Sequence, residues 1–213
     1  MKTDNKTFLK LRARLGDSLG SGSAVSAGIV YDEVDTNGYP VKATVLGKIV
    51  APYAFYKYAS LTDVELPNGL TAIGNDAFTG CTGLTSIELP SGLKSIGTSA
   101  FNGCTGLTEL NIPDSVDSIG TYFASGCSAL VSVHLPVGIE TIPKNSFYNC
   151  KVLKNVNIPQ GVTEIGEDAF NTCRELSSVT LPDGLRVIGA AAFQNVNVYL
   201  YSKLVIPASV ETI

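Results

Sequence analysis

The stretches LTDVELPNGLTAIGNDAFTGC (residues 61–81) and LTSIELPSGLKSIGTSAFNGC (residues 84–104) are copies of one motif that start 23 residues apart. The leading leucine recurs at the same interval along most of the chain, at Leu61, Leu84, Leu107, Leu130, Leu153 and Leu176. A fixed period of this size is typical of a solenoid, in which one supersecondary unit stacks on the next. The sequence therefore predicts six full coils over residues 61–198.

Within each coil, counted from its leading leucine as position 1, the apolar pattern predicts two short strands. Positions 4 and 6, which are Ile87 and Leu89 in the second coil, flank a polar residue as in a half-buried strand. A proline at position 7 lacks an N–H and therefore ends this strand in a turn. Leu93 and Ile96, at positions 10 and 13, predict the second strand, and the Ala-Phe-x-x-Cys segment after it predicts one helical or 3-10 turn.

Two coils depart from the pattern. The third reads Tyr122-Phe123-Ala124 where the others have x-Ala-Phe, so either the turn shifts locally or the two aromatic residues repack the same cavity. In the fourth, Pro143 stands where the other coils have glycine at position 14. The backbone at this position is therefore not expected to need a positive φ.

The cysteines follow the same period, at Cys81, Cys104, Cys127, Cys150 and Cys173. Their odd count and even spacing are unlike a disulfide framework, and no C-x-x-C pair suggests a metal site. We interpret them as a column of buried thiols that act as small hydrophobes. Stacked coils would bring neighbouring thiols close, but parallel Cβ vectors oppose disulfide geometry. No cofactor and no metal is predicted.

The ends of the array divide the chain further. Residues 1–23 are predicted as an N-terminal tail, which contains either a short amphipathic helix with a linker or no regular structure. Residues 24–60 are predicted as a hairpin cap around Asn37-Gly38 and a degenerate first repeat. Residues 199–213 form a partial repeat, in which Pro207 follows Pro182 by 25 residues. This end is expected to be poorly capped, so the array continues in a longer chain or packs on another molecule.

Composition limits the classes of function. With 19 acidic and 15 basic residues the net charge is −4, which argues against nucleic-acid binding. No apolar stretch approaches the roughly 18 residues of a membrane span. Arg12, Arg14 and Asp17 interrupt what would be the apolar core of a secretory signal, so either the protein is not exported by that route or a leader precedes this sequence.

With the coil laid out, the chain resembles the BspA-type (Treponema-pallidum-type) leucine-rich repeat family. That family's consensus is similar to Leu-x-x-Ile-x-Ile-Pro-x-x-Val-x-x-Ile-Gly-x-x-Ala-Phe-x-x-Cys-x-x, which residues 61–198 follow nearly position by position. The resemblance implies a right-handed, mostly β solenoid whose concave side carries a parallel sheet. It also implies a bacterial cell-surface or secreted protein, or a phage relative, that attaches to host proteins or to other cells.

Outward positions 3 and 5 of the first strand are the candidate binding residues. We expect them to form ladders across the sheet, with ligand contacts at Asp63, Glu65, Glu88, Glu109, Asn111, His134, Asn155 and Asn157. The acidic members are expected to attract a basic partner or a cation, and an ordinary solvated ladder is the alternative. His134 is the only histidine and has no evident nucleophile and orienting group, so no catalytic residue is predicted.

These observations predict a non-enzymatic binding or adhesion module. Its partner would be a protein of a host or neighbouring cell, or less favourably a glycan. The alternative is a structural or assembly subunit that self-associates through its termini, in particular through the C-terminal end.

Overall fold

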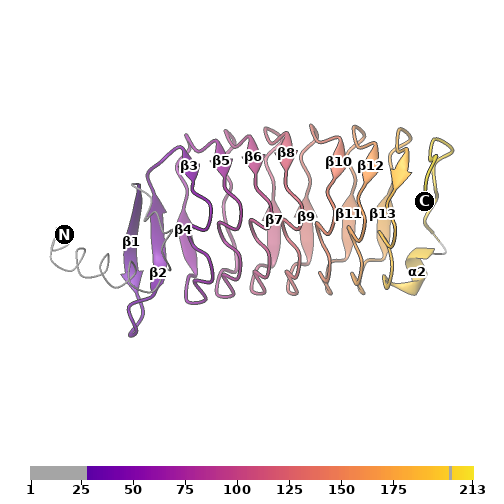
Figure 1. Ribbon diagram of the computed structural model, residues 1–213. Helices are drawn as coiled ribbons and strands as arrows, with labels where there is room; N and C mark the ends of the chain where they lie inside the picture. Colours follow the sequence, from indigo (N-terminus) through magenta and orange to yellow (C-terminus); the bar gives the residue numbers. More distant parts are fainter. Residues whose placement is uncertain (1–27, 202) are drawn as a thin grey trace.

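The computed structural model describes residues 28–201 and 203–213, and the chain winds through them as a parallel β-solenoid (Figure 1). The tail predicted for residues 1–23 lies outside the described residues. The predicted repeat solenoid is confirmed. We number the coils from coil 1, which begins at Leu61, to coil 6, which begins at Leu176, and call the degenerate and partial repeats coils 0 and 7.

Two rows of short parallel strands run along the solenoid. The first-strand row comprises β4 (Asp63–Glu65), β7 (Glu109–Asn111), β9 (Ser132–His134), β11 (Asn155–Asn157) and β13 (Ser178–Thr180). The second-strand row comprises β3 (Ile49–Val50), β5 (Ala72–Ile73), β6 (Ser95–Ile96), β8 (Ser118–Ile119), β10 (Thr141–Ile142), β12 (Glu164–Ile165) and β14 (Val187–Ile188). Paired residues lie one period apart, as Glu109 with Ser132 and Ile142 with Ile165, so each coil stacks directly on the last.

Each row is interrupted once. Residues 84–90 of coil 2 form no strand, so β4 pairs with the preceding β2 (Pro40–Val45) and has no strand partner on the side of coil 2. Glu65 and Glu88 occupy the same position on these successive coils, and like charges facing each other weaken strand pairing. In the second-strand row, β8 and β10 are not paired.

The interior is one continuous column of apolar side chains. Phenylalanine rings of neighbouring coils stack almost parallel, with centroids 5.0 Å apart for Phe55 and Phe78 and 5.3 Å apart for Phe147 and Phe170. The leading leucines Leu61, Leu84, Leu107, Leu130, Leu153 and Leu176 have no exposed surface. Because each coil buries its apolar side only against its neighbours, the core exists only in the stacked array.

The Ala-Phe-x-x-Cys segment is a run of turns rather than the single helical or 3-10 turn expected from its sequence. Alternate N–H groups point in different directions: those of Asp76 and Phe78 donate to the next coil, to the carbonyls of Thr98 and Ala100. The N–H groups of Ala77 and Thr79 instead close local turns on Gly74 and Asp76. A continuous helix would direct all of these donors along one axis, so pairing with the next coil excludes it.

Left-handed residues make this alternation feasible at two positions of every coil. At position 16 φ lies between 54° and 59°, in Tyr53, Asp76, Ser99, Tyr122, Asn145, Asp168 and Ala191. At position 20 φ lies between 57° and 74°, in Lys57, Gly80, Gly103, Gly126, Asn149, Thr172 and Asn195. Gly, Asn and Asp adopt the left-handed region readily, whereas in other residues the Cβ makes it sterically unfavourable. Position 14 shows no positive φ in any coil, as Pro143 indicates.

In coil 3 the phenylalanine stands one position early, but the backbone stays in register with the other coils. Tyr122 keeps the left-handed conformation of its column, and Phe101 N–H donates to the Phe123 carbonyl as in the other coils. Phe123 is 1% exposed and fills the interior from the alanine slot, while Tyr122 stays on the surface. The Phe123 ring meets the Phe147 ring edge-on, with 79° between the ring planes, instead of stacking on it.

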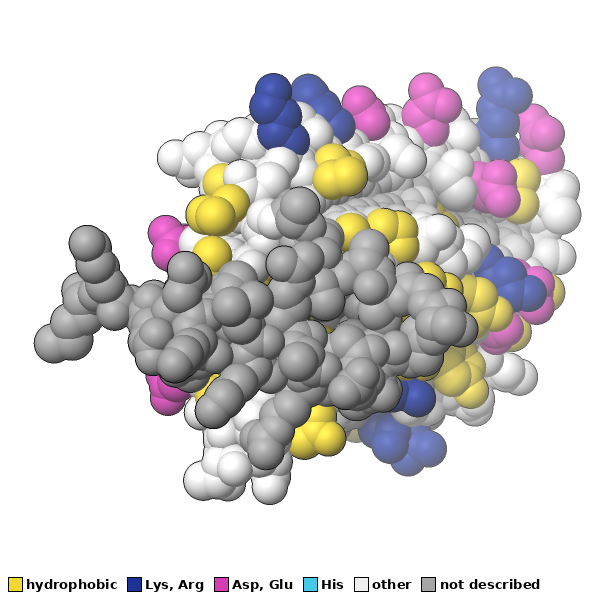
Figure 2. Space-filling view, turned by 60° about the vertical axis from the view of Figure 1, so that its left-hand side comes forward, with side chains coloured by type: hydrophobic (Ala, Val, Ile, Leu, Met, Phe, Trp, Pro, Cys, Tyr) yellow, Lys and Arg dark blue, Asp and Glu magenta, His cyan; other side chains and the backbone are white. Residues whose placement is uncertain are grey.

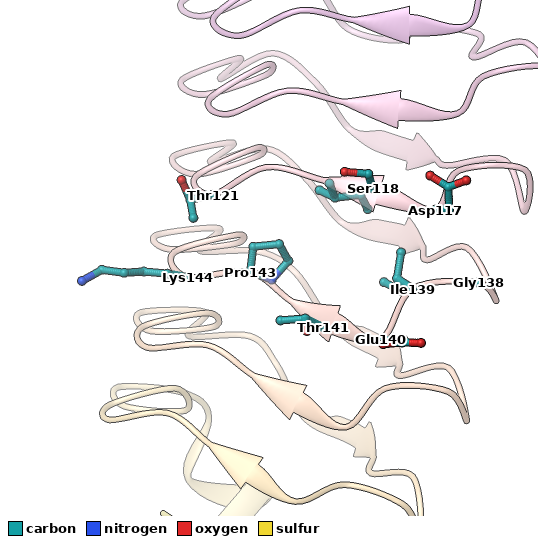
Figure 3. A pocket seen from close by; sticks show the side chains of 10 residues that line it. Asp117, Ser118, Thr121, Gly138, Ile139, Glu140, Thr141, Pro143 and Lys144 are labelled. Carbon is teal, nitrogen blue, oxygen red and sulfur yellow. The ribbon is translucent and has the colours of Figure 1, made fainter.

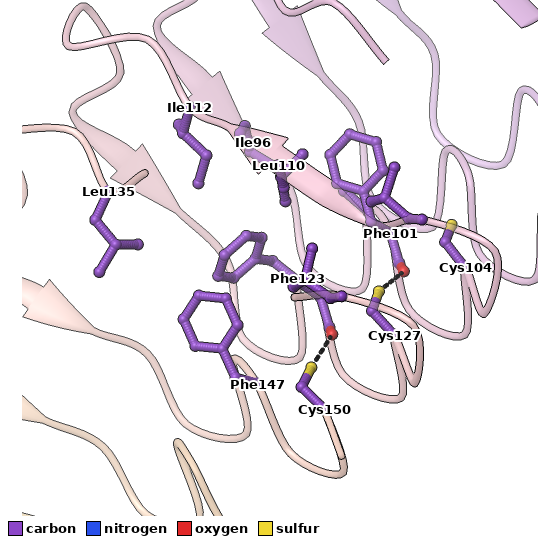
Figure 4. Packing of buried hydrophobic residues seen from close by; sticks show 14 of the residues in the cluster. Ile96, Phe101, Cys104, Leu110, Ile112, Phe123, Cys127, Leu135, Phe147 and Cys150 are labelled. Atoms are coloured by element: carbon purple, nitrogen blue, oxygen red, sulfur yellow. Dashed lines mark hydrogen bonds between the residues drawn. The ribbon is translucent and has the colours of Figure 1, made fainter. Parts of the chain in front are cut away.

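The cysteine column is buried, free of disulfides and hydrogen-bonded (Figure 4). Each Sγ–H donates to a main-chain carbonyl of the preceding coil; Cys81 bonds Phe55 O at 3.0 Å, and Cys150 bonds Ala124 O at 3.3 Å. The thiols are thus more than the small hydrophobes expected. Burial raises the pKa of Cys81, Cys127 and Cys173 to about 12, and raises the pKa of the others well above its ordinary value.

The two ends carry irregular additions. β1 (Ile29–Val34) pairs antiparallel with β2 (Pro40–Val45), and β2 in turn pairs parallel with β4. Thus β2 is the first strand of coil 0, with β1 outside it. At the other end, α2 (Val198–Tyr201) precedes a segment in which Thr212 bridges Val187.

Ala191→Gly is expected to stabilise the protein, because Ala191 is exposed and left-handed and has no side chain beyond Cβ. Relief of the steric cost, less the added entropy of the unfolded chain, predicts a gain of about 0.5–1 kcal/mol in chemical denaturation. The matched control is Ala192→Gly, which removes a buried methyl at ordinary φ and should lose about 1–2 kcal/mol. Equal losses in both variants would contradict the left-handed column.

The thiols are expected to be inert in the folded protein. With a pKa near 12, the thiolate fraction of Cys81 at pH 9 is about a thousandth, whereas unfolded cysteine is largely ionised there. Ellman's reagent at pH 9 should therefore label all five cysteines only after unfolding. Because folding raises the pKa of the Cys81 thiol, its burial as the neutral form contributes fully to stability below the pKa of the unfolded thiol. This contribution falls as the pH rises from about 9 towards 12. Rapid labelling of the native protein would refute the buried column.

Candidate functional site

All eight predicted binding residues are exposed and lie on the first-strand face, which we define as the outward side of the first-strand row. Asp63 and Glu65 lie on β4, Glu109 and Asn111 on β7, His134 on β9, and Asn155 and Asn157 on β11. The intervening Val64, Leu110 and Val156 are buried, so alternation along each strand fixes which side chains face out. Glu88 occupies the equivalent position in coil 2, but its backbone is not a strand, because residues 84–90 form none.

The N-terminal part of this face is acidic, and no basic side chain of the described residues neutralises it. Among the described residues, no ion pair engages Asp63, Glu65, Glu88 or Glu109. Lys42 is the register neighbour of Asp63 but pairs with Glu33, with Nζ 3.6 Å from the carboxylate. Four exposed carboxylates therefore remain available to an external basic group.

The middle of the face carries local hydrogen bonds. Asn111 Nδ2 donates to Glu109 Oε1 at 2.6 Å, which fixes the orientation of that carboxylate. His134 Nε2 lies 3.3 Å from Asp114 Oδ1, and the same oxygen accepts the Val137 N–H at 3.1 Å. Asp114 was not among the predicted site residues. The only sequence signal for it is an acidic residue directly after the proline of a turn, which is a common place for a side-chain cap.

On this face, the described residues show no hydrogen-bonded relay of serine, histidine and carboxylate. Ser132 shares β9 with His134, but the partner of the imidazole is Asp114, and no hydrogen bond joins the serine to the ring among the described residues. Within those residues no group of three or more His, Cys, Asp or Glu side chains could hold a metal ion. No helix in the described part of the chain is long and apolar enough to cross a membrane.

What the geometry provides is a polar surface on a rigid support. Carboxylates, amides and one imidazole are spaced by the strand repeat over β4 to β11 and backed by the buried column. On the part of the surface that Figure 2 shows, acidic and basic side chains are mixed and neither sign dominates. Such a surface can bind by hydrogen bonds and charge without reorganising, which lowers the entropic cost of association.

The sequence matches the model of a known family, described as "BspA type Leucine rich repeat region", in six copies over residues 48–173 and 140–213. The sequence has no significant match among curated proteins.

Several solved structures share the fold. A T. pallidum leucine-rich repeat protein is 32% identical with a TM-score of 0.67, over 79% of this chain and 86% of that one. A leucine-rich cell surface protein of Faecalibacterium prausnitzii is 24% identical with a TM-score of 0.53, over 80% of this chain and 58% of that one. The pneumococcal vaccine antigen PcpA is 26% identical with a TM-score of 0.50, over 84% of this chain and 42% of that one.

Both the repeat of buried Leu, Phe and Cys positions and the family match over residues 48–213 lead to one conclusion: this chain belongs to the BspA-type leucine-rich repeat family.

Proposed function

We propose that this protein is a non-enzymatic binding module that engages a protein partner through its first-strand face. The observation that carries the proposal is the set of exposed carboxylates of Asp63, Glu65, Glu88 and Glu109, which have no internal cationic partner among the described residues. Like charges on one sheet face repel one another and lower the stability of the fold. A basic partner would relieve this repulsion and be attracted by the same charges.

The rest of the face suits a protein partner better than a glycan. Asn111 lies beside Glu109 on β7, and His134, Asn155 and Asn157 extend the polar row beyond the acidic part over two further strands, β9 and β11. A partner that contacts both parts must span several coils, which an extended protein surface does readily. We place the protein at a cell surface or in the secreted fraction, a setting supported by its family and by its similarity to PcpA, which is described as a vaccine antigen.

The alternative function is self-association through the C-terminal end. A hollow of about 460 Å³ lies there, lined among others by Phe193, Leu204 and Ile213, and Val205 nearby is 79% exposed. Apolar surface of this kind favours contact with another apolar surface.

Reversal of the acidic charges tests the proposed function. The triple variant Glu65→Arg, Glu88→Arg, Glu109→Arg should weaken capture of a partner from host or neighbouring-cell extract about tenfold or more, because three favourable rim charges become repulsive. The control Glu164→Arg, Glu175→Arg, Asp183→Arg makes the same change of net charge at exposed positions off this face and should bind as the wild type does.

Unchanged capture by the first variant, with both proteins folded by circular dichroism, would exclude the acidic face as the contact. If instead the mass measured by light scattering rises with protein concentration equally in all three proteins, the self-association function gains support and the proposed one loses it.

A further inference from the structure

The second-strand row has one gap, and it lies between coils 3 and 4. At each other interface from coil 0 to coil 6, two main-chain hydrogen bonds join position 11 and position 14 to the preceding coil. Between coils 1 and 2, for example, Lys94 N–H donates to Thr71 O and Gly97 N–H donates to Ile73 O, both at 2.8 Å. Neither bond has an equivalent between coils 3 and 4 within the described residues.

Pro143 explains the gap in two ways. It has no N–H, so the carbonyl of Ile119 cannot receive the bond that glycine supplies in the other coils. The backbones also approach too closely at this position for a side chain. A Cβ on Gly166, one coil later, would lie 2.6 Å from the Lys144 nitrogen, and real Cβ atoms do not come that near. The pyrrolidine ring of Pro143 therefore holds the second strands of coils 3 and 4 apart.

The separation leaves a cleft of about 610 Å³ on the surface, lined by Ile119, Pro143 and polar residues of both coils (Figure 3). Ile119 is partly exposed, whereas its equivalents in the neighbouring coils, Ile96 and Ile142, are 1% exposed. Asp117 and Glu140 also line the cleft from the same position of successive coils, and their like charges oppose closure.

The other two sides of this interface stay bonded. On the first-strand face β7 pairs with β9 over three residues. On the turn side, Tyr122 N–H donates to Lys144 O at 3.0 Å and Gly126 N–H donates to Tyr148 O at 2.7 Å. The interior contact differs in geometry, since the rings of Phe123 and Phe147 meet edge to face instead of stacking. On the second-strand side, coils 3 and 4 therefore share fewer main-chain hydrogen bonds than any other neighbouring pair from coil 0 to coil 6.

We propose that the interface between coils 3 and 4 is a built-in hinge, at which the solenoid opens on its second-strand side. In a repeat array stability is close to a sum of coil and nearest-neighbour terms, so the second-strand side opens first where the hydrogen bonds between two coils are missing. Residues 28–129 and residues 130–213 then move as two blocks. The hinge axis lies along β7 and β9, where Asn111 pairs with His134, so opening keeps this pair together and changes the angle between the two parts of the first-strand face; only this consequence depends on the proposed function.

Hydrogen exchange of matched amides tests the hinge. The amides of Tyr122, Ala124 and Gly126 bond across the coil 3–4 interface, and those of Asn145, Phe147 and Asn149 bond across the coil 4–5 interface in the same way. The first set should exchange about tenfold faster in the wild type, the factor expected for roughly one missing hydrogen bond. Pro143→Gly restores the missing N–H donor and removes the ring that holds the strands apart. It should therefore slow the exchange of the first set of amides to the rate of the second.

Equal rates for the two sets in the wild type, or no slowing in Pro143→Gly, would overturn the hinge. Pro67→Gly is the control, since it makes the same exchange in a turn far from the interface and should leave the difference between the sets unchanged; if it removes the difference, the hinge is overturned. Should Pro143→Gly fail to fold, Gly166→Ala tests the same cause in reverse. Its Cβ should speed exchange of the second set about tenfold, and unchanged rates would refute the assigned cause.

Discussion

Burial between neighbours is the constraint on which this protein depends. No coil has an apolar side that it can cover alone, so leucine, isoleucine, phenylalanine and cysteine of each coil are packed against those of the next. A side chain that serves this column cannot also face a ligand. The chain is thus left with the outward positions of its strands and turns as the only freely variable surface, and it is there that charge and hydrogen-bonding groups accumulate.

Main-chain hydrogen bonds impose a second constraint, which makes the surface rigid. Alternate N–H groups in the turn segment pair with the next coil, and the thiol of each cysteine satisfies a phenylalanine or alanine carbonyl of the preceding coil. Few backbone groups are left to reorganise when a partner arrives. A face such as that of Asp63 to Asn157 therefore presents its groups at spacings set by the fold, and binding there requires little ordering.

The sequence allowed the period, the buried columns and the outward positions to be predicted, because these follow from spacing alone. The conformation of the Ala-Phe-x-x-Cys segment was not predicted correctly. The hydrogen-bond partner of each N–H there belongs to the neighbouring coil, and the apolar pattern does not indicate it. The contact of His134 with Asp114 depends on how far two side chains reach between coils, which spacing does not reveal. Pro143 was visible as an exception, but its effect required knowing how closely the coils approach.

Deletion of one complete coil tests the shared interior most directly. Removal of residues 153–175 takes out one 23-residue period and joins coil 4 to coil 6 in register, whereas removal of residues 153–171 shifts every later position. In thermal unfolding followed by circular dichroism, the account predicts one cooperative transition for the first deletion, and for the second a transition of lower midpoint and smaller amplitude, because only the coils before the junction still stack. Equal midpoints and amplitudes in the two proteins, or loss of the transition in the first, would contradict a core built from equivalent stacked coils.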